Sequence, residues 1–317
     1  MAYLFDEPAW VRRDLGVVRV TGADRLTYLH TLLSQHLEGA KPGTVADFLY
    51  LDAKGALLAE GRAVVHAEAV LLLMPSPVAA DVAARLEQFK FLLQVEARDV
   101  SDSWAVVSIR GRERIESPGA RRESMTAAPH GDGLVVRDRS GGVDLVGAAE
   151  WVTERAAGLG LPEASAAEWE TWRIASGVPG WQTEIAAGRR PQELGLLPTH
   201  VHLEKGCYPG QEVIAKMYNI GRPKRALAVL ELDGPVPWGT RVEVDGKAGE
   251  ITSCTVRGDG AVALALMPID RTTGQVLGDG TVTGDGVSGK VVSQVGAGMA
   301  QPGAPAAGPG AGRRARA

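Results

Sequence analysis

The chain places its densest reactive chemistry in one eight-residue stretch, residues 205–212, with the sequence KGCYPGQE. A thiol, an amine and a carboxylate follow one another within this stretch. Gly206 and Gly210 allow positive φ or a close approach of the backbone, while the proline between them restricts the turn. The stretch therefore predicts a defined loop that presents Cys207.

Cys207 is the candidate nucleophile of this loop. Apolar residues recur at helical spacing downstream, so we expect a helix that begins beside Glu212, with Cys207 just before its N-terminus. That position and the neighbouring Lys205 favour the thiolate, which attacks electrophiles and binds metals. Cys207 and Lys205 are therefore the predicted catalytic residues. The alternative is a buried, inert cysteine that only packs, since free cysteine is among the most buried residue types.

The KGCYPGQE stretch resembles the signature of the YgfZ folate-binding family, whose members are relatives of the glycine-cleavage T-protein, an aminomethyltransferase. The resemblance extends from about residue 16 to about residue 294. It implies a tetrahydrofolate-binding accessory protein for assembly or repair of iron–sulfur clusters, which supports tRNA modification indirectly. The implied partners are folate and iron–sulfur client proteins, and the implied key thiol is Cys207.

Binding of the folate cofactor requires paired hydrogen-bond donors and acceptors against an apolar wall, and carboxylates suit the N–H edge of a pterin. Glu193 lies in an RPQEL segment that resembles the family's approach to its motif, and Gln211 lies in the motif itself. A solvated loop position is the alternative for both residues. The resemblance adds further motif residues as candidate cofactor contacts: Gly206, Tyr208, Gly210 and Glu212.

The chain departs from the T-protein in an expected hairpin around residues 54–55. The T-protein carries paired aspartates after its hairpin glycine, one of which is its catalytic acid. This chain has the apolar residues 57–59 there, followed by Glu60. Apolar side chains cannot move a proton during aminomethyl transfer. A folate-dependent aminomethyltransferase or demethylase is therefore the alternative function, and enzymatic activity stays open.

Two further clusters suggest other chemistry. His200 and His202 would face one side of a strand, with Cys207 five positions on, but this set lacks a fourth ligand and we expect no metal. A local positive cluster suits a folate glutamate tail, an RNA phosphate or merely a solvated turn; it comprises Lys216, Arg222, Lys224 and Arg225.

Composition limits the classes of partner. The net charge is −4, so charge-driven binding of nucleic acid is not expected, and a tRNA-binding modification factor ranks third among the functions. Cys207 and Cys254 are the two cysteines and lie in unrelated contexts, which indicates reduced thiols in the cytoplasm. Cys254, at the end of an expected strand, has little to activate it and is predicted to be structural. No apolar run reaches the ~18 residues of a membrane span.

The elements that position the loop follow an α+β order. We expect a strand at residues 17–20, a turn in which Asp24 caps a helix over 26–33, two strands over 44–65, a strand at 70–74, a helix over 78–91 and a strand at 91–95. This order is that of a ferredoxin-like unit. A second unit would use strands at 104–109, 134–136 and 143–146 and a helix over 148–157, with an exposed loop at 116–133. A helix over 164–176 follows.

The expected fold class is α+β, with ferredoxin-like subdomains of the T-protein (GcvT-like) type around a central cavity. Residues 1–222 would form this folate-binding region from two interleaved subdomains. Short apolar runs separated by Gly, Asp and Pro turns predict a C-terminal antiparallel β-barrel over residues 223–294. Residues 295–317, rich in Gly, Ala, Pro and Arg, would be a disordered tail.

Overall fold

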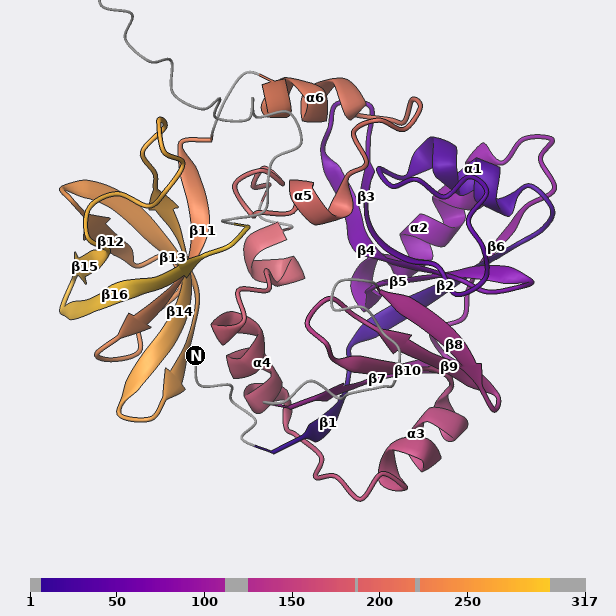
Figure 1. Ribbon diagram of the computed structural model, residues 1–317, viewed down its shortest axis with the longest axis horizontal. Coiled ribbons are helices and arrows are strands. Elements are labelled where there is room, and N and C mark those ends of the chain that lie inside the picture. Colours follow the sequence, from indigo (N-terminus) through magenta and orange to yellow (C-terminus); the bar gives the residue numbers. More distant parts are fainter. Residues whose placement is uncertain (1–6, 112–124, 186–187, 220–222, 297–317) are drawn as a thin grey trace, which may run out of the picture.

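The structure is a computed structural model that describes residues 7–111, 125–185, 188–219 and 223–296 (Figure 1). Its strands form two five-stranded sheets and a closed six-stranded barrel. Figure 1 shows the barrel at one side of the molecule, the two sheets at the other, and helices α4 and α5 between them. This arrangement confirms the expected α+β class and the C-terminal barrel.

The first sheet contains the expected strand–helix unit. Its strand order is β3 (Val45–Leu51), β4 (Leu57–Val65), β5 (Ala69–Pro75), β2 (Leu15–Thr21) and β6 (Glu96–Asp99). Helices α1 (Arg25–Leu32) and α2 (Ser76–Phe89) cover one face, and the alternating apolar residues of the strands form a core with them. The apolar period thus predicts both helices and the hairpin between β3 and β4.

Two local predictions for this sheet are wrong. Residues 91–95 form a turn in which Leu93 N bonds to Lys90 O, and the pairing strand starts only at Glu96. Asp24 does not cap α1 with its side chain. Its carboxylate accepts instead from the backbone N–H of Gln94 at 2.7 Å, so this acid joins the turn to the start of α1.

The second sheet has the order β1 (Ala9–Arg12), β7 (Trp104–Arg110), β10 (Val143–Ala148), β9 (Gly133–Arg137) and β8 (Thr126–His130). One face packs on the first sheet and the other is covered by α3 (Ala149–Ala157). Part of the expected loop at 116–133 is strand β8, whose mostly exposed side chains lack the apolar alternation of a strand. The rest of that loop, residues 116–124, lies outside the described residues.

The barrel closes in the order β11 (Arg225–Leu232), β14 (Gly260–Pro268), β13 (Lys247–Arg257), β12 (Arg241–Val244), β15 (Thr281–Gly284) and β16 (Val287–Gln294). Cys254 lies within β13, opposite Ala263, and not at a strand end. Beyond the barrel, Val295 N bonds to Leu227 O at 2.8 Å, so the chain is still packed where the tail was predicted to start. Residues 297–317 of that tail lie outside the described residues.

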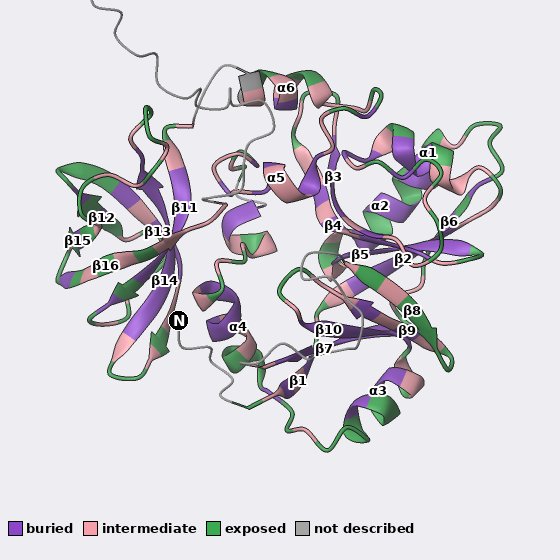
Figure 2. Cartoon of the chain, in the orientation of Figure 1, coloured by how far each residue is buried: buried purple, intermediate pink, exposed green. Residues whose placement is uncertain are grey.

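The segment between the sheets and the barrel carries α4 (Ala166–Ala175), the π-helical turn η1 (Trp181–Ile185), α5 (Leu197–His200) and α6 (Gln211–Asn219). A capping box between Ser165 and Glu168 fixes the start of α4. Figure 2 shows buried residues along the barrel strands and on α4 and α5, where both bodies meet. Residues 200–202 were expected as a strand, but α5 ends at His200 and His202 N bonds to Ser34 O.

Candidate functional site

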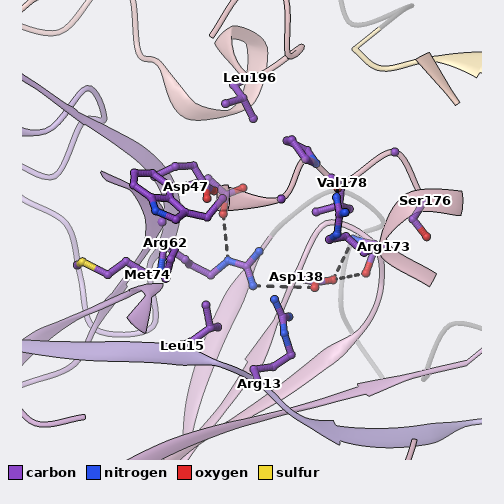
Figure 3. Close-up of a pocket in the computed structure, with 18 of the residues that line it drawn as sticks. Arg13, Leu15, Asp47, Arg62, Met74, Asp138, Arg173, Ser176, Val178 and Leu196 are labelled. Atoms are coloured by element: carbon purple, nitrogen blue, oxygen red, sulfur yellow. Dashed lines mark hydrogen bonds and ion pairs between the residues drawn. The ribbon is translucent and has the colours of Figure 1, made fainter. Parts of the chain in front are cut away.

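A cavity of about 820 Å³ lies where the two sheets meet α4 and the segment before α5 (Figure 3). Its volume is within the range of sites for small molecules and cofactors, about 300–1,000 Å³. Strands of both sheets contribute charged side chains to its lining. Trp172, Val178 and Leu196 add an apolar wall from the opposite side.

Buried charges on both sheets meet in this cavity. Arg62 on β4 pairs with Asp47 on β3 and with Asp144 on β10, each at 3.0 Å. Arg110 on β7 also pairs with Asp144 at 3.0 Å, and Ser108 Oγ donates to the same carboxylate at 2.7 Å. Burial alone would raise the pKa of Asp144, but Arg110 and Arg62 together hold it below its usual value. The network therefore fixes the two sheets to each other through ionised groups.

Glu60 on β4 faces the same cavity. Its Oε1 atom lies 3.0 Å from Nε2 of His200 at the end of α5, and Thr199 Oγ1 contacts Nδ1 of that imidazole at 2.7 Å. Burial lowers the pKa of His200, but the hydrogen bond and charge of Glu60, with the charge of Asp47, raise it overall. This pair places an acid and an imidazole where a ligand in the cavity would meet them.

The motif loop is anchored by Lys205. Its Nζ atom is buried and donates to the backbone oxygens of His30 and Leu33 at the C-terminal end of α1, the second at 2.7 Å. Lysine at this position satisfies carbonyl groups that have no partner within the helix. Burial lowers the pKa of Lys205 to about 8. Lys205 therefore has a structural role, because its ammonium group holds the motif loop against the end of α1.

Cys207 is exposed to solvent. Gln211 Nε2 lies 3.9 Å from its sulfur, while Gln211 Oε1 accepts from the backbone N–H of Tyr208 at 3.0 Å. Cys207 lies four positions before Gln211, the first residue of α6, as expected for a cysteine near a helix N-terminus. The buried, inert alternative for Cys207 does not describe this sulfur.

Gly210 docks the loop against the hairpin of β3 and β4. Its φ is +77°, and a Cβ atom there would lie 2.8 Å from Asp52 O and 3.0 Å from Gly55 Cα. Only glycine fits this contact without strain. Asp47, which lines the cavity, and Asp52 are separated by about 17 Å along the strand direction at the usual rise per residue. The loop thus sits at the hairpin turn, whereas the cavity opens beside the other end of β3.

Apart from Glu193, the predicted site residues lie together on the motif loop and the start of α6, and none of the predicted site residues lines this cavity. Gly206, Tyr208, Gln211 and Glu212 stay with Cys207 on the loop and on the first turn of α6. Glu193 lies 3.7 Å from Arg225 on β11 and is turned toward the barrel. Of the basic cluster, Arg222 lies outside the described residues, and Lys216 and Lys224 are exposed.

Sequence reasoning missed the cavity charges. The sequence marks Glu60 only as displaced from an aspartate position, and no motif marks Asp47, Arg62, Arg110 or Asp144. A signal for these residues exists, because each is a charged residue within a mostly apolar strand, and most residues of these strands are buried.

A metal site is not assembled from the predicted histidines. His200 faces Glu60, whereas the ring of His202 lies 5.2 Å from that of His36. Among the residues that the structure describes, no three His, Cys, Asp or Glu side chains are grouped to hold a metal ion. Within the same residues, no helix has the length and apolar character to cross a membrane.

Comparison with known proteins finds distant relatives of the chain. No family model matches the sequence. A putative chloroplastic transferase of Arabidopsis thaliana is 27% identical over 305 residues, which cover 88% of this chain and 68% of that protein. The tRNA-modifying protein YgfZ of Colwellia psychrerythraea is 22% identical over 253 residues, which cover 75% of each chain. Together with the fold, these two relatives support a YgfZ/GcvT-like family for the chain.

A solved structure shares the fold of this chain. The glycine cleavage system aminomethyltransferase T of Bartonella henselae aligns with a TM-score of 0.74 over 94% of this chain and 88% of its own. Sequence identity is 16%, so this likeness describes the fold. The GcvT-like architecture predicted from the sequence is confirmed.

Proposed function

We propose that this YgfZ/GcvT-like protein is a tetrahydrofolate-binding accessory protein for assembly or repair of iron–sulfur clusters, with Cys207 as its working thiol. It would act in the cytoplasm and support tRNA modification through iron–sulfur client enzymes. The observation that carries the proposal is an exposed sulfur on a loop that a buried lysine anchors. An exposed thiolate has the chemistry to bind cluster iron or to exchange with a disulfide.

The cavity is the proposed folate site, within the α+β region. Its volume of about 820 Å³ suits one small ligand, and Trp172 and Leu196 provide an apolar wall for an aromatic ring. Glu60 presents a carboxylate to the cavity, and carboxylates suit the N–H edge of a pterin. In this proposal the motif residues around Cys207 hold the thiol loop, and the cavity residues bind the cofactor.

The thiol role is tested in cells that lack the protein. Cys207→Ala should fail to restore the activity of an iron–sulfur enzyme, while Cys254→Ala, which changes a half-buried sulfur in the barrel, should restore it. Equal abundance of both variants in the soluble fraction excludes a folding defect. Full restoration by Cys207→Ala would remove the thiol from the mechanism.

A folate-dependent aminomethyltransferase or demethylase is the second candidate. The position of Glu60 in the cavity, 3.0 Å from His200, favours it, because an acid beside an imidazole can carry a proton in a transfer reaction. A steady-state assay for methylene-tetrahydrofolate formation from an aminomethyl donor separates the two functions. We expect no turnover, since residues 57–59 replace the paired aspartates of the T-protein with apolar side chains.

A further inference from the structure

Arg13 is a guanidinium group that lines the cavity without a carboxylate of its own. It lies between β1 and β2, and its Nη1 atom donates to Ser108 Oγ at 3.2 Å. Its Cζ atom lies 3.8 Å from the centroid of the Trp169 ring. Across the described residues, no carboxylate forms an ion pair with Arg13. Figure 3 shows this side chain rising from the strands toward the dashed line that joins Arg62 to Asp138, while no dashed line ends on Arg13 itself.

The charges around Arg13 do not balance. The carboxylates near it are Asp144 and Asp138, and these already pair with Arg110 and Arg62. Arg62 also pairs with Asp47, and Asp47 pairs in turn with Arg139 at 3.2 Å. Four guanidinium groups, those of Arg13, Arg62, Arg110 and Arg139, therefore share the three carboxylates of Asp47, Asp138 and Asp144. Burial lowers the pKa of Arg13 to about 10, a stronger effect than the opposing charge of Asp144. A partly buried cation with this deficit favours an anion from outside the chain.

A second donor lies near the same ring. Nε of Arg110 is buried and has no hydrogen-bond partner among the described residues, although the other nitrogens of this guanidinium are engaged. Its Cζ atom lies 5.7 Å from the centroid of Trp169, the ring on which Arg13 stacks. Trp169 in turn stacks on Trp172, with ring centroids 4.7 Å apart. The stacked pair of rings thus positions the surface on which the Arg13 guanidinium lies.

We propose that Arg13, supported by Trp169, forms a carboxylate subsite at this end of the cavity. The inference rests on the proposed function, because tetrahydrofolate carries glutamyl carboxylates at the end opposite its pterin. One carboxylate matches the single missing negative charge, and a guanidinium receives it with two parallel hydrogen bonds. A phosphate dianion would exceed that charge and would face Asp138 and Asp144.

The decisive comparison uses two ligands and three proteins. Wild-type protein, Arg13→Gln and the control Arg12→Gln, which changes the exposed neighbour, are titrated under anaerobic conditions with tetrahydrofolate and with tetrahydropteroate, which lacks the glutamate. We expect wild type and Arg12→Gln to bind tetrahydrofolate roughly tenfold more tightly than tetrahydropteroate, as for one charge-assisted hydrogen-bond pair. Arg13→Gln should lose that preference and bind tetrahydropteroate as wild type does. Equal affinity of Arg13→Gln and wild type for tetrahydrofolate, or equal weakening for both ligands, overturns the subsite.

A second arm separates this inference from the proposed function. The melting temperature is measured with millimolar p-aminobenzoylglutamate, the tail half of folate without its pterin. We expect stabilisation of the wild type and of Arg12→Gln but not of Arg13→Gln, and a weaker effect for Arg13→Lys, which keeps the charge without the planar fork. If this pattern holds while tetrahydrofolate does not bind, the subsite stands and the folate function falls. No stabilisation of the wild type overturns the subsite.

Discussion

The imidazole of His200 and the carboxylate of Glu60 lie 3.0 Å apart although 140 residues separate them in the chain. The contact joins the end of α5 to strand β4 and places both groups in the cavity lining. It is the one acid–imidazole pair in the described lining of that cavity. Protonation of His200 should therefore affect both the stability of the protein and the charge of the proposed folate site.

Stability should depend on pH through this pair. The folded-state pKa of His200 is raised by Glu60, so its contribution is fully present below the unfolded pKa of about 6.5 and is lost as pH rises through the folded value. Glu60→Gln should lower the free energy of unfolding by about 1–2 kcal/mol at pH 6 and by less at pH 9. Denaturant titrations at both pH values measure it, with the exposed Glu204→Gln as control. A loss independent of pH would contradict the pairing.

The glycines of the motif loop should respond differently to a methyl group. Gly210→Ala places Cβ 2.8 Å from Asp52 O at a positive φ, so we expect a loss of about 1–3 kcal/mol in unfolding free energy. At Gly206 the nearest atom would be 3.9 Å away, and Gly206→Ala should change stability by less than about 0.5 kcal/mol. Thermal melts of both variants test this. Equal effects would mean that the loop does not dock on the hairpin as described.

Lys205 should matter to stability more than to thiol reactivity. Lys205→Met removes the hydrogen bonds to the carbonyls of His30 and Leu33 and should lower the free energy of unfolding by about 2 kcal/mol. Lys54→Met, at an exposed position, should change it little. Urea titration gives the first quantity, and the rate of Cys207 alkylation by iodoacetamide gives the second. Slower alkylation at unchanged stability would instead make Lys205 an activating group.

The ion-pair network between the two sheets should make the stability of the protein fall at low pH. Asp144→Asn removes a buried carboxylate that pairs with Arg62 and Arg110, and it should lower the free energy of unfolding by about 3–5 kcal/mol at pH 7. The pKa of Asp144 is depressed, so its contribution is present above the unfolded value of about 3.9 and is lost as pH falls through the folded one.

The difference between wild type and Asp144→Asn should therefore narrow in strong acid. Unfolding free energies at pH 7 and pH 3 measure this, and Asp132→Asn in the exposed β8–β9 turn is the control. A difference that stays constant with pH would assign the cost to lost packing.

Much of the fold could be predicted from local sequence patterns. The elements that could not be predicted are those that depend on contacts between residues far apart in the sequence. The spacing of apolar residues predicts helix α2, and short apolar runs between Gly and Asp turns predict the barrel strands. Strand β1 has four residues and exists through its pairing with β7, about a hundred positions on, so no local signal marks it. Alternation over residues 200–202 predicts a strand, but His200 is the last residue of α5 and its imidazole is held by Glu60.

The candidate site divides in the same way. The exposed thiol and its glycine-flanked loop could be predicted, since the reactive residues are contiguous. The anchoring of Lys205 to Leu33 crosses 172 residues, and the pairing of Arg62 with Asp144 crosses 82. Neither contact leaves a signal in one sequence beyond a charge among apolar neighbours. Glu193 shows the converse, since its place in a family-like segment does not bring it to the cavity.

The central claim is that the cavity holds tetrahydrofolate while the loop presents Cys207. Anaerobic titration calorimetry of the whole protein with tetrahydrofolate tests it most directly, with Glu60→Gln as the cavity variant and Cys207→Ala as the loop variant. We predict saturable binding of one ligand per chain, weakened about tenfold by Glu60→Gln, as expected for loss of a charged hydrogen-bond partner, and unchanged by Cys207→Ala. Absence of binding to the wild type, or binding indifferent to Glu60→Gln and abolished by Cys207→Ala, would contradict it.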